Sequence, residues 1–164
     1  MPVISTDKDT DALTLTFVAE FDADVERIWQ LWSDPRQLER WWGPPTWPAT
    51  FTRHDVVVGG ESRYHMTGPD GEKSRGWWRI TAVDAPVHLA FDDGFSREDG
   101  EPDSDMPVIH GSVSLEDVDG RTRMTTVNQF ESVEQMDQLI QMGMDEGMRL
   151  AMNQIDDMLA AARA

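Results

Sequence analysis

SVEQMDQLIQMGMDEGMRLAMNQIDDMLAA, residues 132–161, constrains the architecture more than any other segment of this chain. It contains no proline, and good helix formers make up most of it. Ser132 and Gln135 have the spacing of a capping box, in which two residues satisfy each other's backbone N–H groups. A helix of about 28 residues is roughly 42 Å long and must lie across a sheet to bury its apolar side. The segment therefore predicts one long carboxy-terminal helix packed on a β-sheet.

Near the start of the chain, the pattern is that of one strand followed by two short helices. Residues 13–21 place apolar side chains at every second position, which is typical of a strand with one buried face. Asp22 or Asp24 can cap a short helix, because apolar residues then recur at helical spacing, at Val25, Ile28, Trp29 and Trp32. Asp34 and Pro35 begin a second short helix, with the acid as its cap and proline in its first turn.

Residues 49–130 carry the signals of strands and tight turns. Turn sequences occur at Gly59-Gly60, Pro69-Asp70-Gly71 and Asp119-Gly120. The connections are too short for crossover helices, so six antiparallel strands are expected here. The order strand, two short helices, six strands and long helix predicts one α+β domain over residues 12–161, preceded by a loose lead-in over residues 1–11.

The composition excludes several classes of partner. The 164 residues include 31 acidic and 14 basic ones, which gives a formal net charge of −17 at pH 7. We therefore expect no nucleic acid and no membrane as a partner, because both depend on clustered lysine and arginine. The chain has no cysteine, which excludes disulfides and thiolate chemistry. It shows neither a long apolar run nor a secretory signal, so we expect a cytoplasmic protein.

A series of short motifs gives the chain a family likeness. In order, they are Trp32-Ser33-Asp34-Pro35, Trp41-Trp42-Gly43-Pro44, Val58-Gly59-Gly60, Gly68-Pro69-Asp70-Gly71 and Met142-Gly143-Met144-Asp145-Glu146-Gly147-Met148. Over residues 12–160 the chain resembles the START-like (SRPBCC) superfamily, and within it the heat-shock protein 90 ATPase activator homologues. The resemblance implies a helix-grip (START/Bet v 1-like) fold, in which a curved antiparallel sheet wraps around the long helix and an elongated cavity lies between them.

The long helix carries the clearest sign of such a cavity. Gly143, Gly147 and Ala151 recur every four residues, so one side of the helix lacks side-chain volume. Glycine inside a helix costs roughly 1 kcal/mol relative to alanine, so two glycines need a reason. The stripe fits either a hollow that holds a ligand or close packing of the helix backbone on a strand or a second subunit. Met144 and Met148 neighbour the stripe, and we expect them at the cavity.

Tryptophans supply further candidates. Trp41 and Trp42 lie where the family resemblance places the mouth of the cavity, and they would form either an apolar lid or a clamp that holds the short helices on the sheet. Trp77 and Trp78 are adjacent on a strand and must point to opposite faces. We expect Trp78 to face the cavity and Trp77 to lie outside, where it would suit a homodimer contact.

Four side chains on strands complete the set of expected ligand-binding residues: Tyr64, Met66, His110 and Asn128. For His110 a purely structural role is the alternative, because the sequence identifies no orienting partner for it. Residues 99–105 are rich in acids and could bind calcium, but they lack the spacing of an EF-hand, which favours a solvated loop. We expect no metal site and no cofactor, and we assign no catalytic residue.

These observations support three classes of function. The first is binding or sensing of a small, largely apolar ligand in the cavity, without catalysis. The second is an enzyme of the cyclase or hydrolase type that acts on an aromatic or polyketide-like substrate, which would need converging titratable groups such as Tyr64, His110 and Arg79. The third is a protein-interaction module with a vestigial cavity, which would show a filled interior and an exposed apolar patch.

Overall fold

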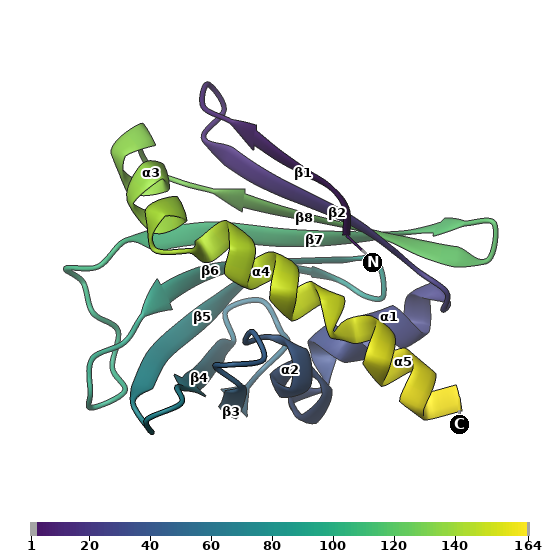
Figure 1. The fold of residues 1–164 in the computed structure, drawn as a ribbon, viewed down its shortest axis with the longest axis horizontal. Helices are drawn as coiled ribbons and strands as arrows, with labels where there is room; N and C mark the ends of the chain where they lie inside the picture. Colours follow the sequence, from purple (N-terminus) through teal and green to yellow (C-terminus); the bar gives the residue numbers. More distant parts are fainter. Residues whose placement is uncertain (1–2, 164) are drawn as a thin grey trace.

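The computed structural model describes residues 3–163 and shows a curved antiparallel sheet that wraps around a run of carboxy-terminal helices (Figure 1). Neighbouring strands follow the order β1-β2-β8-β7-β6-β5-β4-β3. The strands are β1 (Val3–Asp9), β2 (Thr14–Phe21), β3 (Ala49–His54), β4 (Glu61–Thr67), β5 (Lys73–Asp84), β6 (His88–Phe95), β7 (Val108–Val118) and β8 (Arg121–Gln129). The helices are α1 (Val25–Ser33), α2 (Pro35–Trp41), α3 (Val133–Gln141), α4 (Met144–Asn153) and α5 (Ile155–Arg163). The predicted helix-grip fold, with two short helices after the first predicted strand and six further strands, is confirmed.

The prediction of a loose lead-in over residues 1–11 is wrong for most of its length. Residues 3–9 form β1, which pairs with β2 along the edge of the sheet, from Val3 opposite Ala19 to Asp9 opposite Thr14. Every side chain of β1 except that of Val3 is exposed, so the strand has no buried face to impose a period of two on its sequence. The domain limits 12–161 stay a prediction.

The carboxy-terminal segment is not one helix but three. Gly143 separates α3 from α4 with a left-handed φ of 93°, a conformation that glycine adopts without steric cost. A second irregularity lies at Gln154, whose side-chain amide donates a 2.7 Å hydrogen bond to the carbonyl of Gly43 and so ties the α4–α5 junction to the end of α2. At the start of α3, the Ser132 hydroxyl accepts from Gln135 N–H as predicted, but the Gln135 side chain accepts from Glu131 N–H rather than from Ser132.

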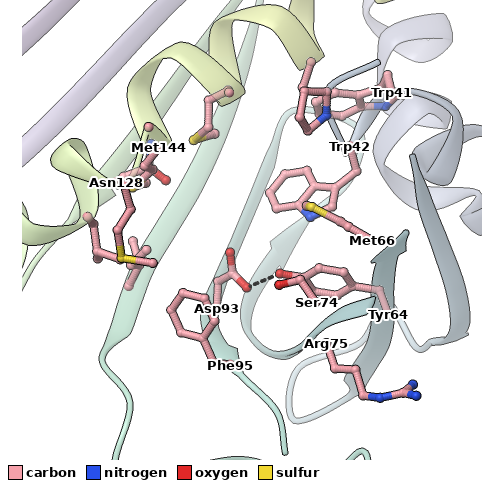
Figure 2. Close-up of a pocket in the computed structure, with 18 residues that line it drawn as sticks. Trp41, Trp42, Tyr64, Met66, Ser74, Arg75, Asp93, Phe95, Asn128 and Met144 are labelled. Carbon is pink, nitrogen blue, oxygen red and sulfur yellow. Dashed lines mark hydrogen bonds between the residues drawn. The ribbon is translucent and has the colours of Figure 1, made fainter. Parts of the chain in front are cut away.

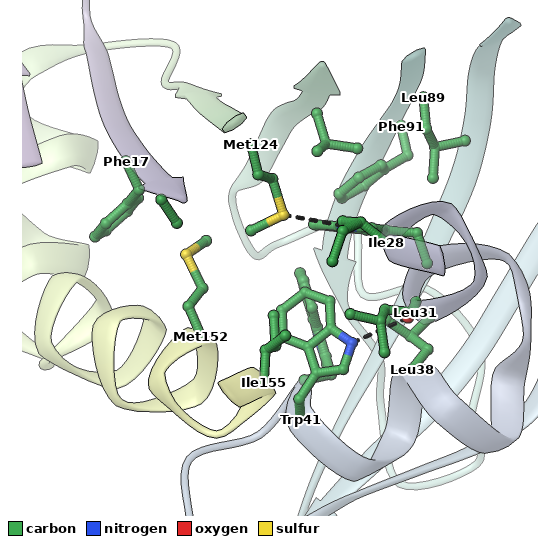
Figure 3. Close-up of a cluster of buried hydrophobic side chains, with 14 of the residues drawn as sticks. Phe17, Ile28, Leu31, Leu38, Trp41, Leu89, Phe91, Met124, Met152 and Ile155 are labelled. Carbon is green, nitrogen blue, oxygen red and sulfur yellow. Dashed lines mark hydrogen bonds between the residues drawn. The ribbon is translucent and has the colours of Figure 1, made fainter. Parts of the chain in front are cut away.

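The short helices α1 and α2 begin at the predicted caps, Asp24 and Asp34, whose carboxylates accept backbone N–H bonds. Both helices pack over one end of the sheet, close to α5 (Figure 1). Four tryptophans and Phe91 form the core at this end; Trp78 stacks on Phe91 with ring centroids 4.0 Å apart. The tryptophans are Trp32, Trp41, Trp42 and Trp78. Figure 3 shows the surrounding aliphatic and methionine side chains, with Met152 and Ile155 reaching the cluster from the carboxy-terminal helices.

The outer face of the sheet carries Trp77, as expected from its neighbour Trp78. Its ring lies over Gly94, where a β-carbon would collide with the indole, and its N–H donates to the carbonyl of Phe95 at 3.1 Å. The outer tryptophan is therefore half-buried within its own chain, and a homodimer through it stays a prediction. Within residues 3–163, no helix has the length and apolar character needed to cross a membrane. The cytoplasmic location likewise stays a prediction.

The two glycines of the stripe should respond oppositely to alanine. Gly143 has φ 93°, so Gly143→Ala should destabilise the protein by about 1–2 kcal/mol. Gly147 lies inside α4 with no heavy atom within 4 Å of an added β-carbon, so Gly147→Ala should stabilise it by about 0.5–1 kcal/mol. Urea denaturation of both variants measures the two changes. A stabilising effect at both positions would contradict the helix break at Gly143.

Candidate functional site

A cavity of about 280 Å³ lies between the sheet and α4. It is lined mainly by aromatic, methionine and aliphatic side chains from β4, β6, β7, α2, α3 and α4 (Figure 2). Its polar lining comes from Tyr64, Ser74, Arg75, Asp93 and Asn128. Met142, 62% exposed at the junction of α3 and α4, marks the side on which the cavity meets solvent.

Nine of the eleven residues expected at the ligand lie around this cavity. They are Trp41, Trp42, Tyr64, Met66, Asn128, Gly143, Met144, Gly147 and Met148. The small-residue stripe therefore faces a hollow rather than a closely packed strand, and Ala151 continues it along the same wall. That these residues bind a ligand stays a prediction.

Trp78 points to the inner face as expected, but it does not reach the cavity. It is fully buried beneath Trp42, whose ring meets it edge-on with centroids 4.8 Å apart. Its indole N–H has no hydrogen bond of ordinary geometry within the described part of the chain, although it lies close enough to Asp93 to lower the pKa of that carboxyl. Trp78 is thus part of the floor that supports the lining rather than of the lining itself.

The expected place of His110 is wrong. It lies on the outer face of β7, 47% exposed at its side chain, where its Nδ1 is 2.6 Å from the Asp92 carboxylate. The reason is strand parity: Ile109, Gly111 and Val113 are buried on the inner face of β7, so the alternate residues His110 and Ser112 point outward. His110 has the orienting partner that the sequence did not reveal, but it is on the wrong side of the sheet to meet the cavity.

Trp41 and Trp42 differ in what they offer a ligand. The Trp41 indole N–H donates a 2.9 Å hydrogen bond to the Leu31 carbonyl and so holds α2 on α1. Among the described residues, the Trp42 N–H has no hydrogen-bond partner of ordinary geometry, and it lies on the side of the ring that faces Tyr64 (Figure 2). The clamp interpretation therefore fits Trp41, whereas a role of Trp42 as an apolar lid stays a prediction.

Tyr64 and Asp93 form the polar centre of the cavity. The Tyr64 hydroxyl donates a 2.8 Å hydrogen bond to Asp93 Oδ1 (Figure 2). The two residues are on strands that are not neighbours, and Gly76 on the strand between them makes the contact possible. A β-carbon at Gly76 would overlap the Tyr64 ring, so only glycine lets the phenol cross β5 and reach β6.

Burial controls the ionisation of this pair. It raises the pKa of Asp93 to about 7, although hydrogen bonding to the Tyr64 hydroxyl and the nearby Trp78 N–H acts in the opposite direction. Burial, followed by the charge of Asp93, also holds the pKa of Tyr64 well above its usual value of 10. Tyr64 therefore remains a proton donor, while Asp93 changes charge near neutral pH.

Asp93 is the main residue that the sequence analysis missed. It lies within β6 and shares a face with Leu89 and Phe91. Asp93 continues the alternation of Leu89 and Phe91, and this periodicity was the available signal that it lies on the inner face. Phe95 follows with the same parity and also lines the cavity. The other lining residues not expected were Pro44, Ser74, Arg75, Ile109, Leu139 and Met142.

A curved sheet gripping a helix, with an apolar cavity and a few polar groups between them, defines a domain of the START-like class. The model of one family, described as activator of Hsp90 ATPase homolog 1-like protein, matches residues 22–160. The chain belongs to this family, and its fold is of a ligand-binding type. Within residues 3–163, no group of three or more histidine, aspartate and glutamate side chains could hold a metal ion.

Solved structures agree with this assignment. A protein from Arthrobacter aurescens is 58% identical, with a TM-score of 0.93 over 97% of this chain and 92% of that one. A protein from Mycobacterium smegmatis is 51% identical, with a TM-score of 0.89 over 96% of this chain and 97% of that one. A putative protein of the dynemicin biosynthetic locus shares the fold at 16% identity and a TM-score of 0.61, over 87% of this chain and 47% of that one. No curated protein matches the chain.

Replacing Asp93 should stabilise the protein above neutral pH. The raised pKa means that the folded state disfavours the charged carboxylate, so the penalty is complete above pH 7 and fades as the pH falls toward 3.8. Asp93→Asn keeps an acceptor for Tyr64 and should stabilise the fold by at most about 4 kcal/mol at pH 8, and by less at pH 5.

Denaturant unfolding of both proteins at pH 8 and pH 5 measures this difference. Asp92→Asn is the control, because that carboxylate lies on the outer face beside His110 and its loss should give no gain. A loss of stability in Asp93→Asn at pH 8 would show that the carboxylate is satisfied within the fold.

Proposed function

We propose that the protein binds or senses a small, largely apolar molecule in the cavity between the sheet and α4, without transforming it. The observation that carries the proposal is the cavity itself, about 280 Å³ of space in the interior of the domain with mainly apolar walls and few polar groups. Its volume is close to the lower end of the range typical of small-molecule sites, which begins at about 300 Å³. The ligand is therefore compact.

The composition of the walls supports a ligand of variable shape. Met66, Met144 and Met148 contribute flexible, polarisable side chains that can adapt to different apolar surfaces. Gly147 and Ala151 keep the helix side of the cavity free of bulk. The break at Gly143, beside the exposed Met142, offers a place where the wall can yield as a ligand enters.

The cavity favours a ligand-binding function over a protein-interaction module, because such a module would have a filled interior. An enzyme is the second candidate, because Asp93 has a pKa near 7 and a hydrogen-bonded phenol beside it, as a general acid or base requires. The putative protein of the dynemicin biosynthetic locus is 16% identical, and this likeness shows the fold alone. Release of an altered molecule from the purified protein would favour the enzyme.

The binding proposal is tested by filling the cavity. Gly147→Leu places an isobutyl group in the open space above Gly147, and it should weaken binding of the neutral fluorescent probe N-phenyl-1-naphthylamine at least tenfold. Native mass spectrometry of the wild-type protein should in addition show a co-purified small molecule that Gly147→Leu lacks.

Glu146→Leu is the matched control, since it adds the same group to the same helix at an exposed position. It should leave probe affinity within twofold of the wild type. Equal binding by Gly147→Leu and the wild type would refute ligand binding in this cavity.

A further inference from the structure

Asp93 is a carboxylate without a compensating charge. Of the cavity's lining residues, only Asp93 and Arg75 carry charged side chains. The Arg75 guanidinium points away from the cavity (Figure 2). Among the residues that the structure describes, Asp93 has one hydrogen bond of ordinary geometry, from Tyr64 to Oδ1, and no cationic partner. Asp93 is half-buried and lines the cavity, and withdrawing an acid from water in this way is costly unless a cation pairs with it.

The second carboxylate oxygen, Oδ2, is the one available to a ligand. Figure 2 shows it turned away from Tyr64, toward the space between Trp42 and Met144. Neither the Trp42 nor the Trp78 N–H has a hydrogen-bond partner of ordinary geometry among the residues that the structure describes, although both lie close enough to influence the Tyr64–Asp93 pair. The acceptor thus faces open space, and Arg75, the one cationic lining residue in the part of the chain that the structure describes, turns its guanidinium away from it.

The walls around this oxygen suit a positive charge. Trp42, Tyr64 and Phe95 present aromatic rings from three different elements, and ring faces attract ammonium groups when water is excluded. The net charge of −17 raises the concentration of cations near the surface. An anionic ligand would meet only repulsion at Asp93, and a neutral one would leave its charge uncompensated.

We propose that the ligand is an organic cation, an amine with a compact apolar body, whose ammonium group pairs with Asp93 Oδ2 between the rings of Trp42 and Phe95. The inference rests on the proposed function, since it names the chemical class that the same cavity takes. The apolar body would lie along the stripe of Gly147 and Ala151, with Met144 and Met148 closing over it. The amine would supply the positive charge that the protein itself does not place beside Asp93.

The test compares matched ligands by isothermal titration calorimetry at pH 8. 2-Phenylethylamine should bind at least tenfold more tightly than its neutral analogue 2-phenylethanol. In Asp93→Asn this preference should disappear while 2-phenylethanol still binds, and in Asp92→Asn, the outer-face control, the preference should be unchanged. If the alcohol binds the wild type as well as the amine does, the cation proposal fails and the proposed function stands. If neither probe binds, both fail.

The pH dependence supplies a second readout. An amine of this kind stays protonated below about pH 9, so its affinity should depend on the fraction of Asp93 that is deprotonated. The affinity should therefore fall about tenfold per pH unit below the Asp93 pKa of about 7. Tyr64→Phe removes a donor that lowers this pKa, so the fall should begin at a higher pH. The strand neighbours of Asp93, Trp78 on β5 and Ile109 on β7, and the lining residues Trp42 and Met144 do not titrate. Arg75, the other charged lining residue described, points away from the cavity. Affinity that rises on acidification would indicate a neutral ligand bound to the protonated acid.

Discussion

The stack of Trp78 on Phe91, with ring centroids 4.0 Å apart, fixes the height of the space between the sheet and the helices. Trp42 stands edge-on against Trp78, and Trp32 and Trp41 complete a layer that Met152 and Ile155 of the carboxy-terminal helices rest upon. Because a helix is rigid over two or three turns, α4 keeps the same separation from the sheet beyond this layer. There the helix presents Gly147 and Ala151 instead of large side chains, so a cavity remains. The cavity beside Gly147 and Ala151 thus depends on the aromatic packing around Trp78.

Much of the fold could be predicted from periodicity, since β2, β7 and β8 alternate buried and more exposed residues along most of their length. The same periodicity also indicates on which face of the sheet Asp93 and His110 lie. Leu89 and Phe91 place Asp93 on the buried face of β6, and Ile109 and Val113 place His110 on the opposite face of β7. A polar residue at a strand position that shares a face with buried apolar residues is a strong signal of a functional site, because withdrawing it from water costs free energy.

Other features could not be predicted from local sequence. β1 is an exposed edge strand, so its pairing with β2 leaves no pattern in its side chains. Gly143 follows a run of helix formers, and its left-handed φ depends on how α3 and α4 pack on the sheet. The hydrogen bond from Tyr64 to Asp93 joins two strands across Gly76, and this combination of three residues is visible only once the strand order is known.

The acidity of the chain has two separate physical consequences. Surface carboxylates act through water and salt, which screen their field within about 8–10 Å, so they influence the approach of a ligand more than its retention. Asp93 acts inside an apolar cavity, where screening is weak and the charge of a bound group matters far more. One interior acid can therefore discriminate between ligands of different charge when some thirty exterior ones cannot. Selectivity in such a cavity follows from where a charge is buried rather than from the net charge of the chain.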